Sequence, residues 1–338
     1  MCFIFIFLII TPPFLSRDMG AYLLGARNFV FFHTNPYLVG LNSVEGNVWI
    51  EQLGPIWTLK YPFAYGPIFL AIASFSVLPN FANLIGAVYS YKLIVFVAYL
   101  LSIFVFSRII KMTSLNPFFA VLYALNPAIL INGVIEGHNE IFIILFLLTA
   151  IYLLIKGDGN KSFLSWVASV FVKYNVLILL PIFWKEGDQF SVKKIFISIC
   201  SVFVLFAIMI GIFFRSNENI FIGNLMIMKG QLDMCLYRCF PSTVAMDLLA
   251  GEFAGVLRLV TFSSLYAFFF YKYLVNENNS LKFIFWAVLT LVFILTKWIS
   301  PWYCLVAIPF GLLIDEDRYR MAVFFLTTYS LVHFFGVL

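Results

Sequence analysis

Long apolar runs constrain the fold of this chain more than any other feature. A helix that crosses a bilayer needs about 20 consecutive, mostly apolar residues. Runs near that length lie at 84–107, 117–135, 139–155, 193–214, 254–275, 282–299 and 319–337, with shorter runs at 1–15, 66–79 and 301–314. Because 63% of the 338 residues are hydrophobic and 11% are charged, with a mean hydropathy of +1.01, the composition excludes a soluble domain. The sequence predicts an all-α polytopic membrane protein, a transmembrane helical bundle of about 10–12 membrane segments, some short or re-entrant.

Lysine and arginine in the short loops set the expected orientation, since cytoplasmic loops carry an excess of both. Five loops hold such residues: Arg108 and Lys111, Lys156 and Lys161, Lys185 with Lys193 and Lys194, Lys272 and Lys282, and Arg318 and Arg320. All five can face the cytoplasm only if 66–79 does not cross fully and 162–184 turns back at its polar middle. This topology predicts that most polar segments gather on the outer face.

The longest polar interruption, 16–65, follows a first apolar segment that is short for a membrane helix or truncated. We expect one integral membrane domain over 1–338, with a first helix at 1–15 and an extracytoplasmic loop carrying interfacial helices at 16–65. The remaining helices occupy 66–338 and include an outer loop at 215–247.

Charge and cysteine content narrow the class of partner. The net charge of +5 contains no block of like charge, so it fits membrane topology and membrane lipids as partners, and predicts no nucleic acid. The five cysteines form no CxxC pair and no zinc-ligand spacing.

Asp18 comes directly after the first apolar segment. One interpretation is a helix N-cap, a role that Asp fills well. The other is a carboxylate at the membrane surface that takes a proton from an attacking hydroxyl. The two interpretations are compatible, because capping by one oxygen leaves the other free.

Ionisable residues also crowd the segment 136–140, which reads Glu136-Gly137-His138-Asn139-Glu140 between two strongly apolar runs. A satisfied polar turn is one interpretation, but Asn-Gly or Pro would serve a mere connector. A divalent cation near Glu140 and His138 is a further alternative, although one histidine with carboxylates from separate segments is not a diagnostic spacing. We predict a functional turn and no cofactor or metal.

Three basic residues stand out by their position. Lys173 lies mid-segment in an apolar run, too deep to snorkel easily, and intramembrane charges by default mark a site. Lys297 lies close to the end of a run, and Arg238 lies between Cys235 and Cys239 in the 215–247 loop. Lys173 is therefore the strongest pointer to a phosphate or carboxylate partner.

An ordered set of motifs spans about four fifths of the chain. It comprises Asp18-x-x-x-Tyr22, Thr34-Asn35-Pro36-Tyr37-Leu38-Val39-Gly40, Trp57, Tyr65-Gly66-Pro67-Ile68-Phe69-Leu70, Leu125-Asn126-Pro127, the 136–140 segment, Val172-Lys173 with Leu179-Leu180-Pro181, and Ser300-Pro301-Trp302-Tyr303. Together these motifs resemble the polyprenol-phosphate-mannose-dependent α-(1→6)-mannosyltransferases, which belong to the GT-C superfamily of integral membrane glycosyltransferases.

The resemblance implies an enzyme of cell-envelope glycan synthesis in the cytoplasmic membrane, with its active site on the extracytoplasmic face. It would move a hexose, most simply mannose, from a polyprenyl-phosphate donor to a glycan or glycolipid acceptor by an inverting single displacement.

The resemblance also assigns roles to individual residues. The general base passes to Asp18, in the 16–65 loop, and the main donor-phosphate contact to Lys173, with Lys297 and Arg238 as further contacts. Acceptor or sugar contacts are expected from His138, Asn139, Glu140, Glu136, Tyr65, Trp302 and Tyr303.

Two departures from the family pattern are visible. Glu140 stands where the family usually has Asp, so its carboxylate reaches about one methylene further. The chain is also short for this superfamily, so its acceptor-binding end is expected to differ. A transporter or flippase of a polar lipid or lipid-linked sugar remains the alternative, since broken helices and buried charges also describe transporters.

Overall fold

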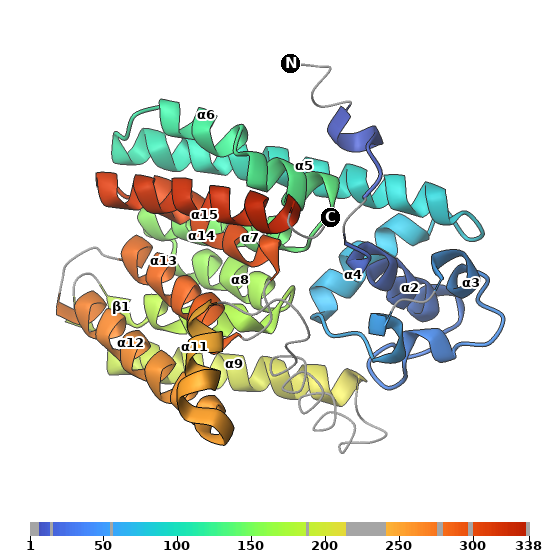
Figure 1. Ribbon diagram of the computed structural model, residues 1–338. Helices are drawn as coiled ribbons and strands as arrows, with labels where there is room; N and C mark the ends of the chain where they lie inside the picture. Colours follow the sequence, from blue (N-terminus) through green and yellow to red (C-terminus); the bar gives the residue numbers. More distant parts are fainter. Residues whose placement is uncertain are drawn as a thin grey trace. The chain divides into compact units, whose positions relative to one another are not determined.

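The computed structural model describes residues 7–13, 16–54, 57–186, 189–213, 241–275, 280–296 and 300–335. These residues are almost entirely helical, as Figure 1 shows, and their one two-stranded sheet is very short. The chain forms an all-α polytopic membrane protein. It divides into two compact units: 1–109 with 129–176 and 201–225, and 110–128 with 177–200 and 226–338.

The first unit holds the long N-terminal loop and the helices around it. Its elements are α2 (Asp18–Phe31), η1 (Leu41–Ser43), α3 (Trp49–Leu53), η2 (Trp57–Lys60), α4 (Pro67–Val77), most of α5 (Leu84–Thr113), the π-helix η3 (Ile129–Ile135), α7 (Glu140–Ile155), α8 (Gly159–Val170), the start of η4 (Tyr174–Phe183) and the second half of α9 (Val192–Phe213).

The second unit holds the C-terminal helices. Its elements are α6 (Phe118–Ala124), the rest of η4 and α9, β1 (Lys185–Glu186), β2 (Gln189–Phe190), α11 (Pro241–Ala250), η5 (Gly251–Phe253), α12 (Ala254–Val275), α13 (Ser280–Thr290), the π-helix η6 (Leu291–Leu295), η7 (Pro301–Val306), α14 (Ala307–Leu312) and α15 (Asp317–Phe335). The strands β1 and β2 pair antiparallel.

Three helices in the described residues are long and apolar enough to cross a bilayer: Leu84–Thr113, Val192–Phe213 and Ser242–Val275. A fourth span is obtained if α6 and η3, which are bent by 50° at Leu125-Asn126-Pro127, count as one. Five shorter apolar helices include α4, whose 11 residues reach about 16 Å, roughly half of a bilayer core. That length agrees with the expectation that 66–79 does not cross fully.

Two sequence expectations about boundaries are modified. The 215–247 loop falls mostly outside the described residues, and its last part is helical, because α11 begins at Pro241, a residue suited to a first helical turn. The first segment, 1–15, is helical at 7–10 and lies partly outside the described residues.

The predicted break inside 162–184 is confirmed. α8 ends at Val170 and η4 begins at Tyr174, so Lys173 lies between two helices instead of inside one. α7 and α8 lie side by side, held by the Ser162 hydroxyl, which donates to the Ala150 carbonyl at 2.6 Å. The hairpin turn uses Gly157 at φ +81°, where a glycine avoids the Cβ clash.

The residues that follow the C-terminal end of α8 are also hydrogen-bonded to the start of α4. The backbone N–H of Gly66 donates to the Val172 carbonyl at 3.1 Å, and the N–H of Ile68 donates to the Phe171 carbonyl at 3.1 Å. These are N–H groups that a helix start leaves without intrahelical partners. A Cβ at Gly66 would collide with the Phe171 carbonyl oxygen, so this close approach requires glycine. The link fixes Tyr65 and Lys173 on neighbouring segments.

Candidate functional site

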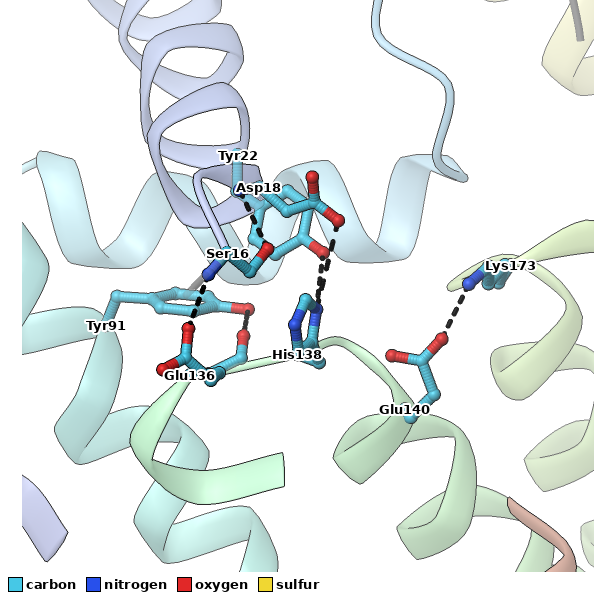
Figure 2. A network of polar contacts seen from close by, with 9 residues as sticks. Ser16, Asp18, Tyr22, Tyr91, Glu136, His138, Glu140 and Lys173 are labelled. Carbon is cyan, nitrogen blue, oxygen red and sulfur yellow. Dashed lines mark hydrogen bonds and ion pairs between the residues drawn. The ribbon is translucent and has the colours of Figure 1, made fainter. Parts of the chain in front are cut away.

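Asp18 is the first residue of α2, and the N-cap position belongs to Arg17. No side-chain cap bond is present at this helix start, so the capping interpretation of Asp18 is wrong. The backbone N–H of Asp18 instead donates to the Ser16 hydroxyl at 3.2 Å, and the backbone N–H of Ser16 donates to Glu136 Oε2 at 2.8 Å. The Asp18 carboxylate therefore makes no capping bond at this helix start, and the Asp18 backbone is linked to the 136–140 turn through Ser16 (Figure 2).

The environment of Asp18 favours its protonated form. The side chain is 25% exposed, and burial of the rest raises the pKa of Asp18 from 3.8 to about 6. The Lys173 ammonium lowers this pKa, whereas the carboxylates of Glu140 and Glu136 raise it further. A carboxylate with a pKa near 6 is a stronger base than an ordinary aspartate and is still largely ionised at pH 7.

The 136–140 turn is shaped by Gly137, whose φ of +67° lies in the left-handed region. A Cβ there would collide with the terminal methyl of Met19 and approach the Tyr91 ring at 3.2 Å. The Tyr91 hydroxyl donates to the Gly137 carbonyl at 3.0 Å. Glycine thus lets this turn pack closely against Met19 of α2 and Tyr91 of α5. The close packing places His138 next to Asp18.

His138 lies between the turn and α2. Its Nδ1 is 3.4 Å from the Tyr22 hydroxyl and 4.0 Å from Asp18 Oδ2, and Figure 2 shows Asp18 and Tyr22 converging on this ring. Burial, with a contribution from the Lys173 ammonium, holds the pKa of His138 well below its usual range. A neutral imidazole faces Asp18 across a gap that a water or a substrate hydroxyl can bridge.

Glu140 begins α7 and forms an ion pair with Lys173, from Oε1 to Nζ at 2.6 Å. The glutamate is 2% exposed and the lysine 19%, so this pair is largely removed from water. Buried side-chain atoms without a hydrogen-bond partner follow in the same stretch: Oε2 of Glu140 and both polar atoms of the Asn139 amide. Such unused hydrogen-bonding capacity is uncommon in folded proteins and is what a polyhydroxylated ligand would satisfy.

Tyr65 packs against Tyr22, which lies one helical turn after Asp18 in α2. Its ring meets the Tyr22 ring edge-to-face at 4.9 Å and the Phe69 ring at 5.3 Å. The first unit therefore brings together seven of the predicted site residues, from four separate segments: Asp18, Tyr65, Glu136, His138, Asn139, Glu140 and Lys173.

Of the four other predicted site residues, two belong to the second unit and two lie outside the described residues. Trp302 and Tyr303 lie in η7 of the second unit, edge-to-face at 6.2 Å. Lys297 and Arg238 lie outside the described residues. Within the described ranges, no three His, Cys, Asp or Glu side chains have an arrangement that could hold a metal ion.

Two residues of the site were missed by the sequence reasoning. Tyr91 and Lys92 lie in α5, which reads as an ordinary membrane span. A signal was available, because Lys92 is the one charged residue between 84 and 107. A lysine in such a position is costly and by default marks a site.

Comparison with known proteins shows which family the chain belongs to. Residues 5–185 match the family model described as "Alpha-(1->6)-mannopyranosyltransferase, N-terminal domain". The match covers α2, the 136–140 turn and Lys173. The chain is also similar to alpha-(1->6)-mannopyranosyltransferase A of Mycobacterium tuberculosis, with 21% identity over 97% of this chain and 67% of the relative. Because the family model covers more than half of the chain, this protein belongs to the alpha-(1->6)-mannopyranosyltransferase family.

Proposed function

We propose that this chain transfers a mannosyl residue from a polyprenyl-phosphate donor to a glycan or lipid-linked acceptor, with Asp18 as the general base. The observation that carries the proposal is the position of the Asp18 carboxylate. It is partly exposed, has a pKa near 6, and adjoins a buried turn with unused polar groups. Family membership supports sugar transfer, and the mycobacterial relative is named for the transfer of mannose.

In the proposed step, an Asp18 oxygen takes the proton from an acceptor hydroxyl as the hydroxyl oxygen attacks the anomeric carbon. The bond between that carbon and the donor phosphate oxygen breaks, and its electron pair leaves with the phosphate. One displacement inverts the anomeric configuration. The acceptor needs a base, and the leaving phosphate needs a cation.

Lys173 is the proposed cation for the leaving phosphate. Its ion pair with Glu140 means that an arriving phosphate must share or replace that carboxylate. We infer that Glu140 holds the ammonium in place until the donor binds. Asn139, with both polar atoms of its buried amide unpartnered, is proposed to contact sugar hydroxyls.

The proposed location is the cytoplasmic membrane, with the site opening to its extracytoplasmic face. A polyprenyl tail would then stay in the bilayer while its phosphate reaches Lys173. The neutral pair of Tyr22 and His138 is proposed to orient the acceptor hydroxyl toward Asp18, which is within 4.0 Å of the His138 ring nitrogen. The comparisons support sugar transfer and give no support to a transporter.

The test is a donor panel with the purified protein in detergent or liposomes. Radiolabelled polyprenyl-phosphate mannose, polyprenyl-phosphate glucose and GDP-mannose are each offered with a broad set of oligomannoside and glycolipid acceptors. We expect label transfer from polyprenyl-phosphate mannose and an inverted anomeric configuration by NMR. Transfer from GDP-mannose alone would exclude the lipid donor, and movement of intact donor across liposomes without transfer would favour the transporter.

A further inference from the structure

Lys92 is an uncommonly placed charge. It lies in α5, about 12 Å along the helix from Leu84, and its side chain is fully buried. A buried ammonium in a helix able to span the bilayer is costly unless it is compensated by acceptors and counter-charge. The acceptors and charges around the Lys92 ammonium therefore indicate its role.

The Lys92 ammonium holds two backbone carbonyls from segments far apart in the sequence. It donates to the Ile135 carbonyl at 2.9 Å and to the Thr11 carbonyl, and it attracts the carboxylate of Glu136. One turn earlier on the same helix, the Tyr89 hydroxyl donates to the Ile10 carbonyl at 3.3 Å. α5 thus fastens the segment that leads into α2 and the end of η3.

The residue next to Lys92 adds a third point of attachment. The Tyr91 hydroxyl donates to the Gly137 carbonyl, so the carbonyls on both sides of Glu136 are held by consecutive residues of α5. Glu136 in turn accepts from the Ser16 backbone, two residues before Asp18. The contacts therefore run from Lys92 to the Ile135 carbonyl, along the backbone to Glu136, and from the Glu136 carboxylate to Ser16 before the start of α2.

We propose that Lys92 is a positioning residue whose buried ammonium, by holding the Thr11 and Ile135 carbonyls, sets the placement of Asp18 relative to His138. The inference rests on the proposed function, in which Asp18 is the base. Lys92 touches neither substrate nor reacting atoms. It attracts the Glu136 carboxylate and holds the two segments that carry the base and the histidine.

The charge environment makes this role measurable. The titratable groups that face Asp18 are Tyr22 from its own helix, Glu136, His138 and Glu140 from the turn, Lys173 from the end of α8, and Tyr91 from α5. Loss of the Lys92 ammonium removes a positive charge that attracts the Glu136 carboxylate, and that carboxylate raises the pKa of Asp18. The acid limb of the rate profile should then move upward.

The experiment is a double-variant cycle of Lys92→Met and Glu136→Gln in the full chain, with Lys111→Met as the matched control. Lys111 lies in the last turn of the same helix and is exposed. For each protein the melting temperature in detergent and the pH profile of kcat/KM for sugar transfer are measured. Glu136→Gln keeps an oxygen that can accept from the Ser16 backbone.

We expect Lys92→Met to melt at a lower temperature, to lose about 10²-fold in kcat/KM, and to shift the acid limb upward by on the order of one pH unit. The double variant should regain most of the melting temperature, because it no longer carries the Glu136 charge that the missing ammonium attracted. Its acid limb should lie at or below that of the wild type. Lys111→Met should match the wild type in every measurement.

Two results would overturn the inference: additive melting-temperature losses in the double variant, or an unshifted acid limb in Lys92→Met. If Lys92→Met does not fold, failure of the double variant to fold would also overturn the inference. A wild type inactive with every donor would overturn the proposed function and the positioning role with it. The melting-temperature cycle would then still decide whether Lys92 and Glu136 form a buried pair.

Discussion

Two charged clusters in this chain look alike in the sequence and differ in their setting. The 136–140 turn and the 315–320 segment both pack acidic residues at the start of a helix. In the second, Arg320 pairs with Asp317 at 2.5 Å and Arg318 with Glu316 at 2.5 Å, and Asp317 is 87% exposed. In the first, Glu136, His138, Asn139 and Glu140 are all buried.

The difference lies in where the hydrogen-bonding capacity goes. Exposed ion pairs such as those at 315–320 contribute little, about 0–1 kcal/mol each, because water solvates both partners well. Buried groups without partners, such as the Asn139 amide, lower the stability of the ligand-free protein. A ligand that forms hydrogen bonds with them offsets this cost. Burial with unused polar atoms therefore separates a candidate site from a solvated helix end.

The largest difference between the clusters should appear when one cation is removed from each. Lys173→Met leaves the buried Glu140 carboxylate uncompensated, so we expect a loss of about 3–5 kcal/mol in unfolding free energy and of sugar transfer. Lys282→Met removes one of the two partners of Glu316, which keeps Arg318, and should cost about 1 kcal/mol or less. Denaturant unfolding in micelles measures both, and equal losses would contradict the contrast.

Gly66→Ala tests how closely the segment before Lys173 must approach α4. An added Cβ collides with the Phe171 carbonyl oxygen, which is backbone and cannot move alone. We expect a loss of about 1–3 kcal/mol and reduced transfer, because Tyr65 and Lys173 separate. Gly211→Ala, in α9 with open space around it, is the control and should be neutral or stabilising. A Gly66→Ala protein as stable and active as the wild type would refute the close approach.

Gly137→Ala separates backbone strain from site geometry. Gly137 and Gly157 both have φ in the left-handed region, so alanine at either should cost about 1–2 kcal/mol. Only Gly137 also faces Met19 and Tyr91, and nothing lies within 4 Å of a Cβ at Gly157. Melting temperatures should fall similarly, while transfer should fall only in Gly137→Ala. A comparable fall in Gly157→Ala would mean that activity reports stability alone.

The smallest effect is expected from pH. Because Asp18 must be ionised to act as base and its pKa is about 6, kcat/KM should fall tenfold per unit below pH 6. At pH 5 this equals about 1.4 kcal/mol. The stability contribution runs the other way. The folded-state pKa is raised above 3.8, so the stability is fully present below that pH and is lost as pH rises through 6. A flat rate profile between pH 5 and 7 would exclude Asp18.

Local sequence features predicted much of the fold because they act over short distances. Polar residues at Lys173-Tyr174-Asn175 interrupt an apolar run, and the helix breaks there. The length of 66–79 predicted an element too short to cross, and α4 is that short. The acidic crowding at 136–140 predicted a functional turn. The structure has a turn there, with Gly137 in the left-handed region, and its function stays a prediction.

Pairing across the chain was beyond reach of the sequence alone. Lys173 was expected to meet a phosphate or carboxylate, but its partner Glu140 lies 33 residues away on another helix. A helix N-cap was one of two interpretations of Asp18, based on residue type, and only the helix start at Asp18 itself removes it. Lys92 was passed over because the apolar run around it is strong. Helical periodicity shows which face of a helix is apolar. These contacts depend on how the faces of different helices pack together, which periodicity does not show.

Substitution of Asp18 shows whether its carboxylate is the general base. Asparagine keeps the size and polarity of Asp18 and removes its basicity, and Asp158→Asn, at the exposed pair with Lys161, is the matched control. Initial rates of mannose transfer from polyprenyl-phosphate mannose are measured at pH 7.5, together with melting temperature. We expect Asp18→Asn to lose about 10²–10⁴-fold in rate with an unchanged or higher melting temperature, and Asp158→Asn to keep its rate. An Asp18→Asn protein that transfers mannose at the wild-type rate would contradict the account.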